Sequence, residues 1–278
     1  GGSTIFQDSD LFKIENQKSS DWIKKEINEL RNLDNLEIKT RTSVAAFHGY
    51  NFLLARENLT DHLNINGNQN KVRQRLLKIR AKKVILATGS LERPLIFNNN
   101  DRPGIMLSSA IKKYTDYYGV LCGRKSIFFT NNDSAYESVI SLHKKGIKVE
   151  AIIDIRKKSE SNLVKEVEKI GIKIYWSHTI TNTYGYKRIK KITFMELSDD
   201  GLSVIGNKKD LECDCLGVSG GWTPAVHLFT QSGGKLAFGE KKFYFYPGKT
   251  TLDQLSVGAC AGFFNLKKII QDTYIKVN

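Results

Sequence analysis

Short apolar runs separated by polar turns recur along the chain, and some of them alternate with stretches of helical spacing. Residues 126–130 and 149–154 are apolar runs of strand length. Between them, apolar residues recur at helical spacing at Ala135, Val139 and Leu142. Ser134 followed by Glu137 predicts a capping box at the start of this helix. The pattern therefore predicts a β-α-β unit over 126–154, which is the building block of a parallel sheet.

Similar patterns predict further elements on both sides of this unit. Helices are predicted over about 20–33, after Ser161 and around Leu266. Thr223 is predicted to cap a short helix with Pro224 at its first position. Strands are predicted at 36–44, where 36–39 alternate and the strand ends in 41–44, and at 45–56, 73–80, 83–87, 172–176, 189–194, 211–215 and 255–257. The mixture predicts an α/β protein with a small antiparallel sheet before residue 84.

The apolar run at 84–86 continues into Ala87, Thr88 and Gly89, which predicts a fully buried strand that ends in a tight turn. Glycine at such a turn lets the main chain come close to a flat or charged group. A second strand enters a glycine turn at Gly258. Taken alone, these patterns fit a purely structural strand end as well as a ligand site.

The β-α-β unit at 126–154 carries one feature of a dinucleotide-binding fold and lacks another. Asp154 closes its second strand, where such folds place the carboxylate that holds a ribose. A dinucleotide site also needs Gly-x-Gly-x-x-Gly, so that the main chain can approach the pyrophosphate. The turn at 131–136 has no glycine, and its Asp133 would repel phosphate. We therefore expect a dinucleotide-binding fold that has lost its nucleotide.

Composition and charge narrow the class of protein. A length of 278 residues allows one large domain or two ordinary ones. The net charge of +14 suggests nucleic-acid binding, but the lysine pairs are scattered along the chain rather than clustered. A lysine-rich surface is the preferred explanation, and no nucleic-acid partner is expected. Apolar runs of about five residues fall far short of a membrane span, so no membrane partner is expected either.

Residue types that carry chemistry are sparse. The 4 cysteines are too few for a disulfide framework, which favours a reduced, cytoplasmic protein. Cys213 and Cys215 are expected on one face of a strand, but no metal site is predicted because no His or Cys pair lies at suitable spacing. The 5 histidines are dispersed, and the pattern leaves the catalytic residues unknown. The chain opens Gly1-Gly2-Ser3 without a methionine, and we expect preceding residues to be missing.

Longer strings of residues carry more information than the single glycine turns. They lie at 87–94 (Ala-Thr-Gly-Ser-Leu-Glu-Arg-Pro), 99–106 (Asn-Asn-Asp-Arg-Pro-Gly-Ile-Met), 118–121, 130–136, 218–224 and 227–236. Together these strings resemble the flavoprotein family with two dinucleotide-binding domains. Within that family they are most similar to the α subunits of heterotetrameric sarcosine oxidase, and the similarity extends over nearly the whole chain.

The resemblance implies two Rossmann-like domains of the FAD/NAD(P)-binding, disulfide-reductase-like kind, the first of them incomplete. It assigns 1–108 and 219–278 to an FAD/NAD-binding domain that lacks its N-terminal β-α-β unit. It assigns 109–218 to an inserted second Rossmann-like domain without bound nucleotide, and the family's C-terminal aminomethyltransferase-like domain is also missing. The residues that the resemblance places at the dinucleotide are Gly1, Gly2, Ser43, Val44, Ala87, Thr88, Gly89, Gly258 and Ala259.

The resemblance also implies an activity. The cofactor in the first domain would be NAD or FAD, with FMN at the interface with a flavin-carrying β subunit, in a hetero-oligomer that also contains small subunits. Such a complex converts sarcosine, oxygen and tetrahydrofolate into glycine, hydrogen peroxide and methylene-tetrahydrofolate, and this chain alone would be inactive. Alternatives are the α subunit of an amine, opine or proline dehydrogenase complex, and a nucleotide-free structural subunit.

Overall fold

The apolar runs at 126–130 and 149–154 form neighbouring strands of a five-stranded parallel sheet. In sheet order its strands are β11 (Lys173–Trp176), β10 (Val149–Asp154), β9 (Ser126–Thr130), β15 (Cys215–Ser219) and β8 (Ile105–Leu107). Ile127 of β9 lies opposite Ala151 of β10 on one side and Leu216 of β15 on the other. With α3 (Ser134–Lys144) between β9 and β10, the predicted β-α-β unit is confirmed.

Both faces of this sheet are covered, which explains why its strands are continuous apolar runs. Alternate residues point to opposite faces. Phe128 and Ile152 pack against α2 (Ser108–Asp116), α3 and α4 (Asn162–Lys169). Ile127, Phe129 and Ile153 pack against an antiparallel sheet on the other face. The strands of that second sheet are β12 (His178–Tyr184), β13 (Lys191–Leu197) and β14 (Val204–Glu212).

The remaining elements form a second group with its own core. It contains β1 (Lys13–Ile14), β2 (Gln17–Lys18), α1 (Ser19–Arg31), the antiparallel sheet β3 (Thr42–His48), β4 (Phe52–Asn58) and β5 (Gln74–Arg80), the parallel pair β6 (Val84–Leu86) and β19 (Gln254–Ser256), the hairpin β17 (Leu236–Gly239) and β18 (Tyr244–Pro247), α5 (His227–Gln231), the 3-10 helix η2 (Gly258–Ala261) and α6 (Leu266–Val277). Phe47, Leu86, Phe229 and Cys260 are buried together at its centre.

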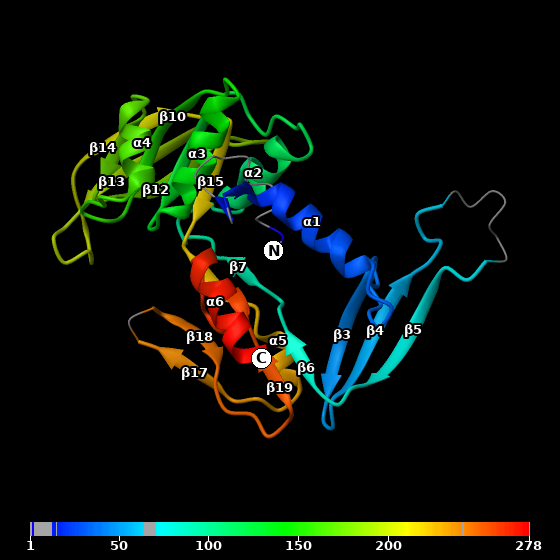
Figure 1. Ribbon diagram of the computed structural model, residues 1–278. Helices are drawn as coiled ribbons and strands as arrows, with labels where there is room; N and C mark the ends of the chain where they lie inside the picture. The colour runs from blue at the N-terminus through cyan, green and yellow to red at the C-terminus, as the bar shows by residue number, and fades with distance from the viewer. Residues whose placement is uncertain (1, 3–12, 15, 64–70, 241, 278) are drawn as a thin grey trace. The chain divides into compact units, whose positions relative to one another are not determined.

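These groups correspond to two compact units of the chain (Figure 1). The first contains Gly1–Leu91 and Thr223–Asn278, and the second contains Glu92–Trp222. The chain crosses between the units in β7 (Ser90–Glu92) and β16 (Trp222–Pro224). The structure, a computed structural model, describes residues 2, 13, 14, 16–63, 71–240 and 242–277.

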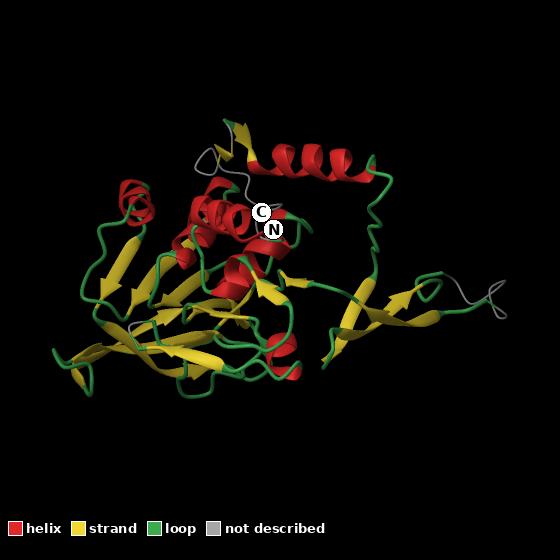
Figure 2. Cartoon of the chain, turned by 60° about the horizontal axis from the view of Figure 1, so that its bottom comes forward, coloured by secondary structure: helices red, strands yellow, loops and turns green. Residues whose placement is uncertain are grey.

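Two predicted elements are wrong. Residues 36–39 form no strand, because no neighbouring strand pairs with them, and Figure 2 shows the segment between α1 and β3 as a loop. Their alternating Leu36 and Ile38 are both exposed. Thr223 and Pro224 do not start a helix, because they lie in β16, and α5 begins later, at His227. In both cases the secondary structure depended on whether a neighbouring strand was present to pair with the segment, which the local pattern does not show.

Within the described part of the chain, no helix combines the length and the apolar run that crossing a bilayer requires.

Candidate functional site

The first candidate site lies where two parallel strands of the first unit end side by side. Leu86 of β6 lies opposite Ser256 of β19, and the Val257 amide donates to the Leu86 carbonyl at 3.0 Å. Ala87, Thr88 and Gly89 follow β6 directly, and η2 begins at Gly258 directly after Val257. The structure therefore brings together the predicted site residues 87–89 and 258–259. Carboxyl ends of parallel strands are where open α/β sheets bind ligands.

The main chain at these strand ends is held in a form that glycine favours. Gly89 has a φ of 78° and Gly258 a φ of 68°, both in the left-handed region. A Cβ added at Gly89 would meet no atom within 4 Å, so open space lies beside this turn. A Cβ added at Gly258 would lie 3.4 Å from Cγ2 of Ile269. The turn at Gly89 therefore presents accessible main chain, which is the surface that a phosphate or ribose approaches, whereas Gly258 is buried against Ile269.

Neighbouring contacts fix the turn after β6. The Thr88 hydroxyl donates to the Ala225 carbonyl at 2.7 Å, and the Ala225 amide donates to the Gly89 carbonyl at 3.0 Å. Ala87 and Thr88 are exposed, while Gly89 is half-buried. The turn is thus anchored from one side and accessible from the other.

Two polar side chains on β19 have unsatisfied atoms: Gln254, which lies opposite Val84 at the start of the strand, and Ser256, which lies opposite Leu86 at its end. Gln254 donates through Nε2 to the hydroxyls of Ser232 and Thr250, each at 2.8 Å, but its Oε1 is buried without a hydrogen-bond partner among the described residues. The buried Ser256 Oγ also has none there. A buried polar atom without a partner costs about 1–3 kcal/mol. The Ser256 Oγ and the open turn at Gly89 fit a polar group bound at the strand ends, and the sequence pattern did not single out Ser256.

The other predicted site residues lie elsewhere in the first unit or outside the described residues. Ser43 and Val44 are on β3, in a different sheet from Thr88. That sheet is tied to the core of the unit through Phe47, whose amide hydrogen-bonds the Gln231 Oε1 at 3.1 Å. Gly2 is exposed in a turn, and Gly1 lies outside the described residues.

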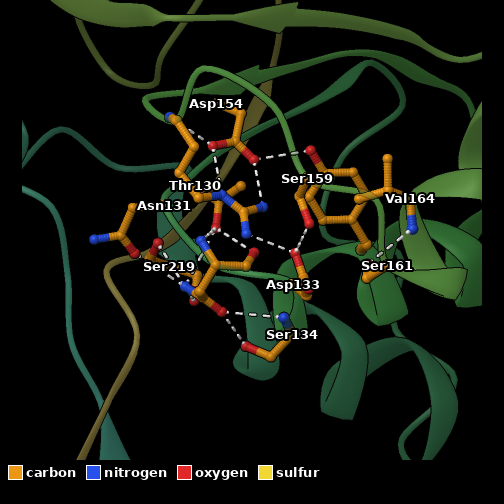
Figure 3. A network of polar contacts seen from close by, with 12 residues as sticks. Thr130, Asn131, Asp133, Ser134, Asp154, Ser159, Ser161, Val164 and Ser219 are labelled. Atoms are coloured by element: carbon orange, nitrogen blue, oxygen red, sulfur yellow. Dashed lines mark hydrogen bonds and ion pairs between the residues drawn. The ribbon is translucent and has the colours of Figure 1, made fainter. Parts of the chain in front are cut away.

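The second candidate site is the turn after β9 in the second unit (Figure 3). Asn132 is its organising residue. The Asn132 amide group donates to Ser219 Oγ at 3.0 Å, and its Oδ1 accepts from the Ser134 amide at 3.1 Å and from the Ser134 hydroxyl at 2.5 Å. The predicted capping box from Ser134 is therefore wrong. The N-cap residue of α3 is Asp133, and the oxygen that serves the first turn belongs to Asn132.

Behind this turn, Arg156 joins two carboxylates. Its guanidinium donates to Asp154 at 2.8 and 3.0 Å and to Asp133 at 2.7 Å. Asp154 is fully buried and also accepts from the Tyr136 hydroxyl at 2.8 Å. Ser159 donates to Asp133 at 3.1 Å. Figure 3 shows the labelled members Asp154, Asp133 and Ser159 close together in this network.

The network also shifts proton affinities. Burial and the Asp154 carboxylate both raise the pKa of the Tyr136 hydroxyl, which therefore stays a donor. Burial works to lower the pKa of Arg156, but the hydrogen bonds and charges of Asp154 and Asp133 outweigh it and raise this pKa. The Tyr136 hydroxyl thus keeps its proton and the Arg156 guanidinium keeps its charge.

In this network, the side chains at the positions where a dinucleotide would bind are already hydrogen-bonded to one another. Asp154, at the position where related folds hold a ribose, is committed to Arg156 and Tyr136. Asp133, in the phosphate turn, is neutralised by the same arginine rather than left to repel a ligand. The sequence pattern missed Arg156, although its place two residues beyond Asp154 at a strand end was a usable signal.

The cysteine pair is arranged differently from the prediction. Cys213 and Cys215 do not share a strand face, because β14 ends at Glu212 and β15 begins at Cys215. The Cys213 thiol is buried in the core on one face of the parallel sheet, and the Cys215 thiol in the core on the other. Burial raises the pKa of each to about 12. Both are packing residues.

Comparisons with known proteins agree with this architecture. The chain is 34% identical over 267 residues to the sarcosine oxidase subunit alpha of Corynebacterium sp. (strain P-1) and 32% identical over 268 residues to that of Rhizobium meliloti (strain 1021). These matches cover 95% and 94% of the chain, but only 27% and 25% of the relatives. The chain thus spans about a quarter of the length of the curated relatives it matches. No protein-family model matches it.

Solved structures show the same fold at lower identity. L-proline dehydrogenase from P. horikoshii matches with a TM-score of 0.65 and 18% identity, covering 99% of this chain and 51% of that one. Thioredoxin reductase from T. acidophilum matches with a TM-score of 0.63 and 16% identity, covering 94% of this chain and 78% of that one. The predicted fold class is confirmed as the FAD/NAD(P)-binding, disulfide-reductase-like α/β fold. Over nearly all of its length, therefore, the chain is a homologue of one segment of the sarcosine oxidase α subunits.

Proposed function

We propose that the chain is part of the α subunit of a sarcosine oxidase complex, a flavin-linked oxidoreductase. The observation that carries the proposal is the identity of 34% over 95% of the chain to a curated α subunit. Both units of the chain lie within the matched length, so the relationship concerns the whole two-unit architecture rather than one common motif. The complex would oxidise sarcosine to glycine, with hydrogen peroxide and methylene-tetrahydrofolate as further products.

In this proposal the first unit binds a dinucleotide, NAD or FAD. Bound there, the cofactor would supply redox or structural support to the flavin chemistry of the complex. The main chain at Gly89 and Gly258 would lie against its ribose and phosphate groups, with Ala87, Thr88 and Ala259 beside them. Ser43, Val44, Gly1 and Gly2 would complete the pocket. The open space beside Gly89 and the unpartnered Ser256 Oγ support this assignment.

The second unit, by contrast, would hold no nucleotide. Arg156 already neutralises the two carboxylates at the place where a dinucleotide would bind. Displacing Arg156 to admit a nucleotide would leave Asp154 buried without its cation, which is costly. The second unit would serve as a rigid scaffold. We thus propose a cofactor domain made of 1–108 with 219–278. The nucleotide-free domain is made of 109–218.

The partners proposed are a flavin-carrying β subunit, with FMN at the shared interface, and small subunits. A purified complex of this chain with its β subunit tests the activity directly. Peroxide formed from sarcosine, but not from proline, is the expected result. An absence of peroxide from sarcosine contradicts the proposal.

A related alternative is the α subunit of an amine, opine or proline dehydrogenase complex. The fold match to L-proline dehydrogenase over 99% of the chain favours keeping it in the test. Reduction of an artificial electron acceptor by proline, without peroxide from sarcosine, would support that alternative. A complex that forms with an empty cofactor pocket would support a structural subunit instead.

A further inference from the structure

An exposed cluster of apolar and aromatic side chains follows α2 in the second unit. We call it the tyrosine patch, and its members are Tyr114, Tyr117, Tyr118, Val120 and Leu121. All of them are exposed, with exposed fractions of 59% for Tyr117, 56% for Tyr118 and 53% for Leu121. Single exposed apolar residues are ordinary, but a contiguous group of them marks a surface that another molecule covers.

Local structure holds the patch together. After α2 ends at Asp116, the chain folds back so that the Val120 amide donates to the Tyr114 carbonyl at 2.9 Å. The buried Thr115 hydroxyl donates to the Val120 carbonyl at 3.4 Å. The loop and the last turn of the helix are thus tied together, and Val120 and Leu121 are fixed next to the tyrosines.

The tyrosine rings also contact one another. Tyr117 and Tyr118 meet edge to face with 4.9 Å between ring centroids, and Tyr114 and Tyr118 are 5.7 Å apart. Such a group loses little side-chain freedom on binding, because its rings are already restrained. Tyrosine supplies large contact area with a polar tip, which explains its enrichment in the centres of protein interfaces.

Charged side chains close to the patch in sequence are mostly basic, although one of them, Lys125, pairs with the exposed Glu212 at 3.3 Å. Between residues 108 and 125 the chain has four basic side chains, Lys112, Lys113, Arg124 and Lys125, and one acidic side chain, Asp116. Asp116 is committed to Lys112 at 2.9 Å, to Lys145 at 3.5 Å and to the Ser141 hydroxyl at 2.6 Å. Its carboxylate is 7% exposed and contributes little negative charge to the surface. Basic side chains therefore outnumber acidic ones next to the patch.

From this arrangement we infer that the tyrosine patch is a docking surface for a protein subunit with an apolar groove and an acidic rim. An aromatic centre with basic side chains next to it complements such a groove, because opposite charges steer association and apolar burial stabilises it. Single-stranded nucleic acid fits less well, since bases need free ring faces for stacking and one ring face in the Tyr117–Tyr118 pair is occupied by the edge of the other ring. The inference deepens the proposed function, on which it rests, by assigning one surface that holds the complex together.

The test uses this chain co-purified with the flavin-carrying β subunit. Tyr117→Ser with Tyr118→Ser is the main variant, and Arg124→Glu tests the basic side chains next to the patch. Matched controls in the same unit are Tyr186→Ser, at a tyrosine that is 90% exposed, and Lys187→Glu next to it. The paired tyrosine change is expected to weaken subunit affinity at least about tenfold, the charge reversal several-fold and only at low salt, and the controls not at all.

Each outcome separates the inference from the proposed function. If the unaltered chain fails to bind the β subunit, the proposed function fails. If the unaltered chain binds and the Tyr117→Ser/Tyr118→Ser variant binds equally well, the inference about the patch is overturned while the proposed function stands.

Other occupants of the patch are tested in parallel. Patch-dependent binding to phosphatidylserine vesicles or to a single-stranded RNA would overturn the protein-partner assignment. A lowered unfolding temperature of the paired variant without any partner would also overturn it, because the patch would then be covered by the chain itself.

Discussion

Among single residues, Arg156 has the clearest structural role, because it serves a fully buried carboxylate and a half-exposed one at once. Removing one partner of a buried ion pair leaves the other charged and desolvated, and that penalty exceeds what the pair contributes when intact. The sequence pattern placed Asp154 at the correct strand end but did not reveal its partner. The place of Arg156 two residues beyond Asp154 was a usable signal for that pair, but its contact with Asp133 joins two strand ends and depends on the tertiary fold.

Arg156→Ala is therefore expected to lower the free energy of unfolding by about 3–5 kcal/mol, since Asp154 would remain buried without its cation. Urea denaturation followed by circular dichroism measures the loss. Lys157→Ala is the matched control, because Lys157 pairs with the fully exposed Asp199 and its removal should leave stability unchanged. Equal stability of the two variants would show that the network contributes nothing specific.

The buried thiols give a second prediction at this scale. With pKa values of about 12, Cys213 and Cys215 carry very little thiolate at pH 8, and iodoacetamide should label them on the order of a thousand times more slowly in the folded chain than in urea. Mass spectrometry of alkylated peptides measures both rates. Rapid labelling of the folded protein would contradict the burial described for these thiols.

These thiol pKa values also determine a pH dependence of stability. Since the folded state binds the thiol protons more tightly than the unfolded state, the free energy of unfolding should fall as the pH rises from the ordinary value of 9.0 toward about 12.

Among the elements, those with strong periodicity and their own hydrogen-bonding partners were predictable. The helix predicted over about 20–33 is α1, and the strands at 126–130 and 149–154 are β9 and β10. The strand expected at 36–39 was not formed, because alternation predicts a strand only where a neighbour completes the hydrogen bonds. The predicted site at the ends of β6 and β19 forms only because these two strands pair. Leu86 lies opposite Ser256, and more than 160 residues of chain separate them. Resemblance to a family supplied that long-range information, and periodicity did not.

The strand ends at β6 and β19 give a prediction with a closely matched control. Gly89 and Gly201 have similar φ values, 78° and 71°, and a Cβ at either would meet no atom within 4 Å. Replacing either by alanine should cost about 1 kcal/mol of stability through backbone strain. Only Gly89→Ala should also weaken dinucleotide binding, because only there would the new methyl group project into the proposed site. Isothermal titration with NAD and with FAD measures the difference, and equal affinity of both variants and the unaltered chain would exclude Gly89 from the pocket.

At the scale of the whole molecule, the chain consists of two units with separate cores and different proposed roles. The first presents open strand ends, while the second fills the equivalent place with its own ion pairs. This division resembles a duplicated cofactor fold of which one copy serves binding and the other serves as scaffold. The fold class and the relationship to α subunits were predictable from the sequence, whereas the cytoplasmic location and the choice of amine substrate remain predictions.

The division into two units predicts which main-chain amides a bound dinucleotide protects from hydrogen exchange. Adding NAD or FAD should slow amide hydrogen exchange around Leu86–Ser90 and at Ser256–Ala261, because a ligand that binds only the folded site opposes its local opening. Exchange at 130–136, in the turn after β9, should not change. Protection of that turn by the dinucleotide would contradict the proposal that the second unit holds no nucleotide.

The measurement that tests the central claim most directly is mass spectrometry of the small molecules released when the purified chain, isolated without its flavin-carrying partner, is denatured. Release of NAD or FAD in an approximately equimolar amount is the predicted result, and it would identify the cofactor of the first unit. Release of neither dinucleotide would contradict the account, because the open strand ends of β6 and β19 would then be a structural feature rather than a cofactor site.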